Sequence, residues 1–421
     1  MTPPSTDKDQ QNMTITPASF GVQRSPRTVV FGAGQRALLG RQAAEYGRKA
    51  LVCTDQRLAA SAEFAELIAD LSDHGLEVSV WTDTAAELPA SDIEACYSAM
   101  KDSGIEVVIG IGGGSCLDLG KAIALLLSHG GPLDRYYGEN AVPGPVLPII
   151  AVPTTGGTGS EVTPVCVLSD SRRELKAGIS SAYLVPSVAI CDPELTYSCP
   201  PGLTASAGAD AVSHLVESFT AIQRPPTAVG EGRVFIGKNV ISDSYARWGL
   251  GLLARALPEA FEHPDDRQAR SDVMLAANAG GYALGVAGTA AAHALQYPLG
   301  ALTHTAHGVG VGALLPYVMR YNASVRVREF AEIATFFGIP ESGGGEVQAL
   351  AGIDAIDRLL DRIGIPPTLK ELGLTEDQLS YVASMGMKSA RLVDNNPRPL
   401  DADALYEITR AAYFGDRSNP F

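Results

Sequence analysis

The amino-acid sequence predicts an α/β region with a mostly parallel sheet, followed by an all-helical region. In the first half of the chain, short apolar runs alternate with stretches of helical apolar spacing, a pattern typical of a parallel sheet flanked by helices. Two of the apolar runs end in glycine-rich turns. From Pro200 onward helical periodicity continues without strand-like runs. We therefore expect a loose tail at residues 1–18, an α/β domain at 19–200 and a helical domain at 201–421.

The elements of the α/β domain follow one another regularly. The strand-like runs are TVVFGAG, ALVCTD, EVSVWTD, EVVIGIGGGS and PIIAVP. Helical apolar spacing is found in QRALLGRQAAEYGRK, SAEFAELIADLSDHG and SDIEACYSAMKDSG. In the second half, the main helical segments are PPGLTASAGADAVSHLVESF, DSYARWGLGLLARALPEAF and SDVMLAANAGGYALGVAGTAAAHAL.

Length, charge and cysteine content narrow the class of protein. The chain has 421 residues, 46% of them hydrophobic, which is enough for two domains with substantial cores. The net charge of −15, without a basic run interleaved with aromatics, argues against nucleic acid as a partner. We expect no membrane helix, because no stretch reaches the roughly eighteen apolar residues that a span needs. The six cysteines form no C-x-x-C pair and the start lacks a secretory pattern, so we expect a cytoplasmic protein.

Four side chains in the helical region have the chemistry of metal ligands. Asp210 and His214 are four residues apart, so on a helix they lie on one face and can hold one ion. His293 and His307 are too far apart to meet locally, so the fold has to bring them together. Three imidazoles and one carboxylate suit Zn²⁺ or Fe²⁺ better than Ca²⁺ or Mg²⁺. A D-x-x-x-H pair is also common as a buried hydrogen-bonded pair, so a second motif has to support this interpretation.

Two glycine-rich turns supply that second motif. VVIGIGGGSCLDLGKAIALL is typical of a strand, a tight turn and a helix, with glycines at 112–114 that let the backbone approach a ligand and a helix that offers free amides to a phosphate. It matches neither the G-x-G-x-x-G fingerprint nor the P-loop. A second polar turn, residues 154–160, follows another apolar run. Such turns are often only tight connections, but two of them at the carboxyl ends of strands form a crevice suited to a dinucleotide.

An acidic residue, Asp55, ends the second strand-like run. A carboxylate at this place can accept hydrogen bonds from an adenosine ribose and would repel a 2′-phosphate, which favours NAD(H) over NADP(H). The alternative is that Asp55 only caps the next turn.

The blocks GGGSCLDLGK, PTTGGTGSEVT and GADAVSHLVESF, with the spaced His293 and His307, resemble the iron-containing (group III) alcohol dehydrogenase family. The resemblance covers about residues 20 to 415, down to NNPRPL. It implies an α/β dinucleotide-binding domain followed by a helical metal-binding domain, the fold shared with dehydroquinate synthase, usually as a homodimer. It also implies NAD(H), which family members with an acid at the position of Asp55 tend to prefer, and one divalent metal, Fe²⁺ first and Zn²⁺ second.

The resemblance also implies site residues. Asp210, His214, His293 and His307 match the metal ligands; Gly113, Gly114, Ser115 and Asp118 match the pyrophosphate turn; Thr154, Thr155 and Thr158 match the second nucleotide-contacting turn; and Lys176 matches a lysine near the cofactor and is also a candidate catalytic residue.

Two departures from the family pattern are visible. Many members have a histidine near the nicotinamide where this chain has Tyr297, a candidate proton relay whose unperturbed pKa of about 10 differs from that of histidine. His304 is a second candidate for that role, unless it is only a solvated or hydrogen-bonded loop histidine. The segment RPPTAVGEGRVFIGKNV is longer than the usual connection, and we hypothesise that Arg224, Arg233 or Lys238 in it recognises an anionic substrate group, the alternative being a solvated loop.

The sequence thus predicts an enzyme that interconverts a small alcohol and its aldehyde or ketone with NAD(H) and a metal, leaning to a reductase of an acidic aldehyde such as phosphonoacetaldehyde. The alternatives within this chemistry are a general primary alcohol dehydrogenase and a maleylacetate reductase. A non-redox cyclase of the dehydroquinate-synthase type would need more basic side chains around the metal than AAAHALQYPLG offers. A binding protein on an inactive enzyme fold is the alternative from another class.

Overall fold

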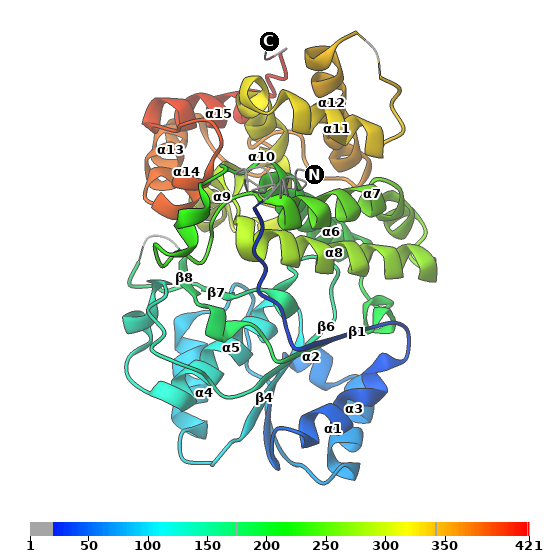
Figure 1. The fold of residues 1–421 in the computed structure, drawn as a ribbon, viewed down its shortest axis with the longest axis vertical. Helices are drawn as coiled ribbons and strands as arrows, with labels where there is room; N and C mark the ends of the chain where they lie inside the picture. The colour runs from blue at the N-terminus through cyan, green and yellow to red at the C-terminus, as the bar shows by residue number, and fades with distance from the viewer. Residues whose placement is uncertain (1–19, 174–175, 342, 419, 421) are drawn as a thin grey trace, which may run out of the picture.

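The computed structural model describes residues 20–173, 176–341, 343–418 and 420, and the predicted tail at 1–18 lies outside them. The chain forms an α/β region below and a helical region above (Figure 1). The last strand of the α/β region ends at Cys191, and the first long helix of the upper region, α6, begins at Pro201.

The α/β region is built on a six-stranded sheet in which every neighbouring pair is parallel, as predicted. The strand order is β1-β9-β6-β4-β2-β3. The chain moves from β2 outward to β3 and then back past β2 to β4, so the order reverses between β2 and β4. Ligands in open parallel sheets bind at such a switch point, outside the carboxyl ends of the strands. The strands are β1 (Thr28–Phe31), β2 (Lys49–Cys53), β3 (Glu77–Trp81), β4 (Val107–Gly112), β6 (Ile149–Pro153) and β9 (Val188–Cys191).

Helices cover both faces of this sheet, because alternate side chains of each strand point to opposite faces. Leu51 of β2 belongs to a buried cluster with Ile93 and Leu119 of the helices on one face. Its neighbour Val52 belongs to a cluster with Phe64 and Leu67 on the other face. The helices are α1 (Leu39–Ala44), α2 (Gln56–Ala59), α3 (Ala62–Asp73), α4 (Ala90–Met100) and α5 (Gly114–His129).

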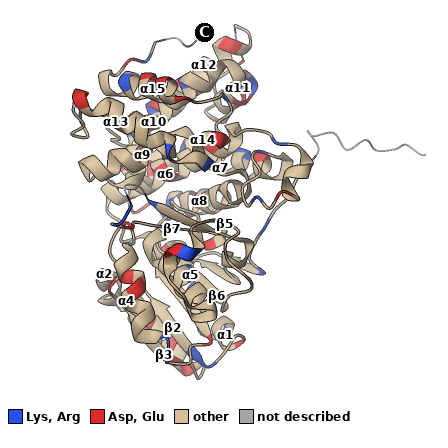
Figure 2. Ribbon diagram, turned by 90° about the vertical axis from the view of Figure 1, so that its left-hand side faces the viewer, with Lys and Arg blue, Asp and Glu red and all other residues tan. Residues whose placement is uncertain are grey.

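A small second sheet lies between the main sheet and the helical region (Figure 1). It contains β5 (Gly138–Glu139), β8 (Ala177–Ser180) and β7 (Val165–Leu168), with β5 parallel and β7 antiparallel to β8. The sequence interpretation missed these strands and β9; β7 and β9 are short apolar runs, whereas β5 has only two residues, Gly138 and Glu139. Acidic and basic side chains are interspersed over the helices and loops of both regions (Figure 2).

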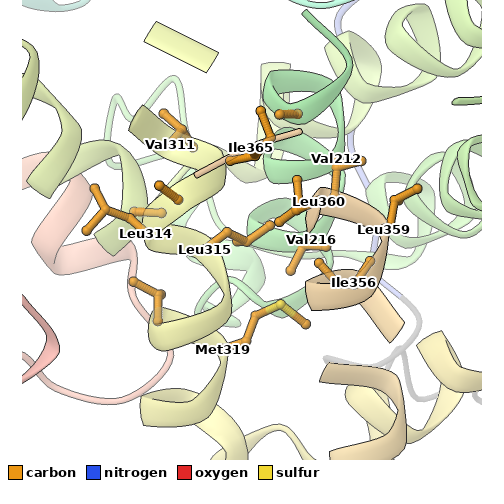
Figure 3. Close-up of a cluster of buried hydrophobic side chains, with 14 of the residues drawn as sticks. Val212, Val216, Val311, Leu314, Leu315, Met319, Ile356, Leu359, Leu360 and Ile365 are labelled. Atoms are coloured by element: carbon orange, nitrogen blue, oxygen red, sulfur yellow. The ribbon is translucent and has the colours of Figure 1, made fainter. Parts of the chain in front are cut away.

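The upper region is helical throughout its described residues, apart from one isolated bridge between Gln223 and Gly237. Its core includes apolar side chains of α6, α10 and α12, among them Val216, Leu315 and Ile356 (Figure 3). The helices are α6 (Pro201–Thr220), α7 (Val240–Glu262), α8 (Arg267–Ala287), α9 (Ala291–Thr303), α10 (His307–Asn322), α11 (Val327–Phe336), α12 (Gly345–Arg362), α13 (Leu379–Met387), α14 (Ala390–Asn395) and α15 (Ala402–Phe414).

The predicted helical segment at 271–295 contains parts of two helices, α8 and α9. Gly288 has φ +77 and ends α8, and the chain turns before α9 begins. In the described residues no single helix is long and apolar enough to cross a membrane; α8 and α9 meet that test only when taken as a pair, which is bent by 104°.

Two glycines let the helical region approach the α/β region closely. Gly159, with φ +62, lies in the turn after β6, and Gly281 lies in α8. A Cβ built on Gly281 would lie 2.4 Å from the carbonyl oxygen of Gly159, closer than real Cβ contacts allow. Backbone therefore meets backbone where α8 packs on the second glycine-rich turn.

Candidate metal and dinucleotide site

The four predicted metal ligands meet at one point. Helix α6 places Asp210 and His214 one turn apart, His293 is the third residue of α9, and His307 is the first residue of α10. The Nε2 atoms of His214, His293 and His307 lie 3.4, 3.7 and 3.5 Å from Oδ1 of Asp210. Asp210, His214 and His293 are buried, and their candidate ligand atoms all lie within 4.8 Å of one another.

The donor set fits a divalent cation. Oδ1 of Asp210 and Nε2 of His293 are buried and have no hydrogen-bond partner among the described residues. Buried polar atoms are normally hydrogen-bonded, and unpaired ones call for an explanation such as a bound ion. One carboxylate oxygen and three imidazole nitrogens that converge on one centre give a cation the ligands that Fe²⁺ or Zn²⁺ accept. The structure brings the four side chains together, and their role as ligands stays a prediction.

Two further side chains orient the histidines. Nδ1 of His293 lies 2.6 Å from a carboxylate oxygen of Glu217, and Nδ1 of His307 lies 2.7 Å from Oε1 of Gln296. Both partners accept the Nδ1 hydrogen, so the Nε2 atom of each ring is directed at the centre. Glu217 also accepts hydrogen bonds of 2.9 and 2.7 Å from two backbone amides at the start of α9. The sequence interpretation missed Glu217 and Gln296, although each lies three residues after a candidate ligand on the same helix face.

The electrostatics of the cluster suit ligands that give up protons to a cation. Burial lowers the pKa of His214 and lowers that of His307 well below its usual value, so both rings are neutral at pH 7. Burial also acts to lower the pKa of His293, but the Glu217 and Asp210 carboxylates outweigh it and raise the pKa to about 9. Burial acts to raise the pKa of Asp210, but the surrounding imidazoles outweigh it and lower the pKa, so its carboxylate stays ionised.

The first glycine-rich turn is open to a phosphate. Gly112, the last residue of β4, has φ +148, and Gly114 is the first residue of α5. The residue between them, Gly113, has no side chain to cap the helix, so the first amides of α5 remain available at the wall of the cavity. A Cβ on Gly114 would lie 2.7 Å from Cγ2 of Thr158, which faces it from the second turn. The two turns can therefore approach this closely only because residue 114 is glycine. A site for a pyrophosphate would need such a close approach.

The other predicted cofactor residues have different surroundings. Among the described residues, Thr155 and Thr158 line the cavity with Ser115, whereas Thr154 is buried behind them. Asp118 lines the same cavity, but its two oxygens accept hydrogen bonds from Oγ of Ser160, at 2.6 Å, and from a backbone amide of β7.

Asp55 caps helix α2, since its Oδ1 accepts a 2.8 Å hydrogen bond from the amide of Leu58. Its other oxygen, Oδ2, lies 3.9 Å from Sγ of Cys116, in the first turn of α5. The capping role and a role in cofactor choice are compatible, because they use different oxygens.

The glycine-rich turns and the histidine cluster line one cavity of about 340 Å³, which we call the inner cavity. A wider outer cavity of about 1250 Å³ adjoins it, bounded by β7, β8 and α14. Five residues line both cavities: Val165, Val167, Lys176, Tyr297 and Arg391. The inner cavity thus contains both candidate sites and adjoins the outer cavity at these side chains.

Tyr297 and Lys176 lie together at this opening. The Tyr297 ring centroid is 6.3 Å from that of His307, and Nζ of Lys176 is 5.8 Å from the Tyr297 centroid. Burial raises the pKa of Tyr297, so its hydroxyl stays protonated. Lys176 forms an ion pair with Glu87. His304 is exposed at the end of α9, with φ +53, and does not line the inner cavity in the described chain.

Of the three cations proposed to bind an anionic substrate group, the structure brings one to the outer cavity and none to the inner one. Arg233 lines the outer cavity and pairs with Asp394 at 3.1 Å. Arg224 also pairs with Asp394, at 2.6 Å, away from both cavities. Lys238 is held between Glu329 and Asp243 at 2.8 and 3.0 Å. Arg391, which the sequence interpretation did not single out, is the arginine that lines the inner cavity in the described part of the chain.

Comparison with known proteins matches this geometry to one family. Residues 26–193 match the model of iron-containing alcohol dehydrogenases, and residues 204–413 match the C-terminal model of the same family. The chain belongs to the iron-containing alcohol dehydrogenase family and is an oxidoreductase, as the resemblance implied.

Individual relatives share nearly the whole chain. It is 36% identical to long-chain-alcohol dehydrogenase 1 of Geobacillus thermodenitrificans over 88% of this chain and 91% of that protein. The crystal structure of a 1,3-propanediol oxidoreductase superposes with a TM-score of 0.87 at 31% identity, covering 94% of this chain and 100% of that one. The sulfoacetaldehyde reductase of Bifidobacterium kashiwanohense in complex with NAD⁺ superposes with a TM-score of 0.79 at 33% identity, covering 95% and 100%.

Proposed function

We propose that this protein uses NAD(H) and one divalent metal to reduce a small aldehyde that carries an anionic group, and to oxidise the corresponding alcohol. The observation that carries the proposal is that a glycine-rich turn at a helix start and four converging candidate metal ligands line one cavity. The amides at the start of α5 would hold the phosphates of a dinucleotide, and the cluster would hold the metal. With both sites on one cavity, the protein would hold the hydride donor and the carbonyl close together, which is its main contribution to such a reaction.

The four ligand side chains would hold the metal, which when bound supplies a Lewis acid for the substrate oxygen. Glu217 and Gln296 hold the His293 and His307 rings in the orientation that points Nε2 inward. NADH, when bound, supplies the hydride. The Tyr297 ring lies 6.3 Å from the His307 ring, and its hydroxyl can donate a proton or a hydrogen bond to the substrate oxygen. Lys176, beside Tyr297, is positioned to support that proton transfer by keeping positive charge nearby.

The finer cofactor assignments are also proposals. Fe²⁺ is proposed ahead of Zn²⁺ on the family name, since the ligand set suits both metals. NAD(H) is proposed ahead of NADP(H) because Asp55 comes just after β2, the strand beside the switch point. The negative charge on its Oδ2 oxygen would repel a 2′-phosphate. The homodimer and the cytoplasmic location expected from the sequence remain predictions.

Cationic side chains at the opening of the inner cavity support an anionic substrate. Lys176 and Arg391 line it, whereas Arg172 and Arg233 of the outer cavity beyond are already paired with Asp170 and Asp394. The sulfoacetaldehyde reductase among the structural relatives is consistent with this preference. The second candidate is a general primary alcohol dehydrogenase, favoured by the apolar side chains of Phe235 and Leu284 on the inner cavity and by the long-chain-alcohol relative.

A panel assay separates these candidates. Anaerobically purified, iron-loaded protein is mixed with NADH and neutral or acidic small aldehydes, and NADH oxidation is followed, with metal-stripped protein as control. We expect turnover of acidic aldehydes that disappears on stripping and returns with Fe²⁺. Equal turnover of neutral aldehydes would favour the general dehydrogenase. A protein that binds metal and NADH but oxidises no NADH would contradict the proposal and favour the cyclase alternative.

A further inference from the structure

Arg391 lies in α14, beside α9 and above β7 and β8 (Figure 1), and its side chain lines both the inner and the outer cavity. Its guanidinium carbon lies 4.3 Å from the centroid of the Phe235 ring, which fixes the plane of the guanidinium. The Nη1 atom is buried and has no hydrogen-bond partner among the residues that the structure describes. A Cβ on Gly288 would lie 3.4 Å from this nitrogen, so the backbone packs against it on that side.

This lack of an acidic partner distinguishes Arg391 from three other cations around the opening; a fourth, Arg173, stands over the Tyr137 ring at 4.6 Å. Lys176 forms an ion pair with Glu87, Arg172 with Asp170 at 2.9 Å, and Arg233 with Asp394 at 3.1 Å. In the described chain Arg391 forms no ion pair within 4.0 Å, although burial of an unpaired charge is costly. The carboxylates of Glu139 and Glu217 act on Arg391 electrostatically without forming an ion pair with it among the described residues, and a bound anion would offset the remaining cost.

We propose that Arg391 binds the anionic group of the substrate, a carboxylate, sulfonate or phosphonate, while the carbonyl end of the same molecule lies at the histidine cluster. The inference deepens the proposed function and rests on it. A guanidinium placed over an aromatic ring still presents its N–H groups as a planar fork, which suits an oxyanion with two or more oxygens. Tyr297, the histidine cluster and Arg391 all line the inner cavity. The cluster would therefore bind the carbonyl end of a short substrate and Arg391 its anionic end.

Three variants test the inference. Arg391→Gln removes the charge but keeps a side chain of similar length, and Arg391→Lys restores a charge without the fork. Arg233→Gln is the matched control, because it removes one positive charge from the outer cavity at an arginine that already has an acidic partner. Circular dichroism and thermal melting establish that each variant is folded.

The first readout is binding. Isothermal titration measures the affinity of the metal-loaded protein, saturated with NAD⁺, for 2-hydroxyethanesulfonate, 3-hydroxypropanoate and 2-hydroxyethylphosphonate, with 1-propanol as the neutral reference. We expect Arg391→Gln to weaken at least one of the anions by roughly 10- to 100-fold, the value of a charge-assisted hydrogen bond. Arg391→Lys should recover part of the loss. Arg233→Gln should leave the anions within about threefold, since an exposed charge is worth little.

The second readout is the ratio of kcat/KM for an anionic aldehyde to that for a neutral aldehyde of equal chain length. This ratio should fall with Arg391→Gln, mainly through KM, and stay constant with Arg233→Gln. The affinity for NADH alone, followed by its fluorescence, should not change. An equal loss for neutral and anionic ligands, or a loss of NADH affinity, would assign Arg391 to structure or to the cofactor and overturn the inference.

The two readouts separate failure of this inference from failure of the proposed function. Anion binding that depends on Arg391 without turnover of any aldehyde would uphold the anion site and contradict the proposed reaction. Turnover of aldehydes with no preference for an anion, and no anion binding, would uphold the reaction class and overturn the role of Arg391.

Discussion

The two walls of the inner cavity are built by opposite means. The metal wall, formed by α6, α9 and α10, consists of large buried side chains whose atoms converge on one centre and are held by further side chains. The cofactor wall, formed by the turns after β4 and β6, consists of glycine backbone and short polar side chains. The metal wall depends on the donor atoms of its side chains, whereas the cofactor wall depends on glycines that leave room for a ligand.

Because of this difference, we expect substitutions in the two walls to impair ligand binding in different ways. On the metal wall, removal of a donor atom removes part of the site. On the cofactor wall, addition of atoms fills the cradle. Since the two walls come from different regions of the chain, each type of change should affect one ligand and leave the other bound.

The largest effect is expected on the metal wall. His214→Ala removes one of the four donors, and we expect activity to fall by roughly 10³-fold or more, because a Lewis acid contributes several kcal/mol to the transition state. NADH affinity should remain within about twofold of the parent, since the cofactor turns are untouched. Bound metal is measured by elemental analysis and NADH by fluorescence. Ser213→Ala, on the next residue of α6, is the control. Loss of both NADH and metal binding in His214→Ala would contradict the expectation that the two walls bind their ligands independently.

The reciprocal change is Gly114→Val on the cofactor wall. A Cβ at this position would lie 2.7 Å from Cγ2 of Thr158, so the new side chain closes the cradle between the two turns. We expect NADH affinity to fall by roughly 10- to 100-fold, the usual cost of overpacking, with the full complement of metal retained. Gly202→Ala is the control, because a Cβ there meets nothing within 4 Å. Unchanged NADH affinity in Gly114→Val would place the cofactor elsewhere.

Glu217→Gln sharpens the comparison within the metal wall, since Glu217 is a partner of a ligand and not itself one of the four. The isosteric amide keeps an acceptor but loses the charge that orients His293. We expect metal affinity to weaken by roughly 10- to 100-fold, with activity recovered at high metal concentration. Competition with a coloured chelator measures the affinity, again with Ser213→Ala beside it. Activity that stays low with a saturated site would assign Glu217 a direct role in the reaction.

The smallest effect concerns Asp55, behind the cofactor wall. Asn caps helices as well as Asp does, so Asp55→Asn keeps the cap on α2 and removes only the charge. We expect the KM for NADPH to improve by roughly tenfold, with little change for NADH, because the repulsion of a 2′-phosphate is relieved. Asp83→Asn, a neighbouring exposed acid, is the matched control. An unchanged NADPH KM would leave Asp55 with capping as its role.

The two walls also differ in how far the sequence predicted them. The cofactor turns are local, because strand, glycines and helix are contiguous in the chain, and the sequence located both. The α6 pair, Asp210 and His214, is local in the same sense. The meeting of that pair with His293 and His307 depends on packing between three helices. The sequence therefore predicted the complete set of four only through the family resemblance.

What the sequence did not reveal has a common physical cause. Arg391 lies far along the chain from the glycine-rich turns and the histidines, and the packing of α14 on α9 brings it to the cavity. Lys238 looked available near the metal helix, but two acids from α7 and α11 hold it. The availability of a charge depends on its partners in space, which a single sequence does not show.

The contact between Gly159 and Gly281 has a consequence for how the enzyme tolerates change. Helix α8 touches the cofactor turn through Gly281, while a Cβ on the adjacent Gly280 would lie 3.7 Å from Cβ of His214. The helix therefore separates the glycine-rich turn from the histidine cluster, and under the proposed function its thickness would set the gap that a hydride has to cross. A displacement of the reacting atoms by about 1 Å can cost a factor of roughly 10² in rate. One added methyl group at Gly281, which touches neither ligand, would widen that gap and slow the chemistry while both ligands still bind.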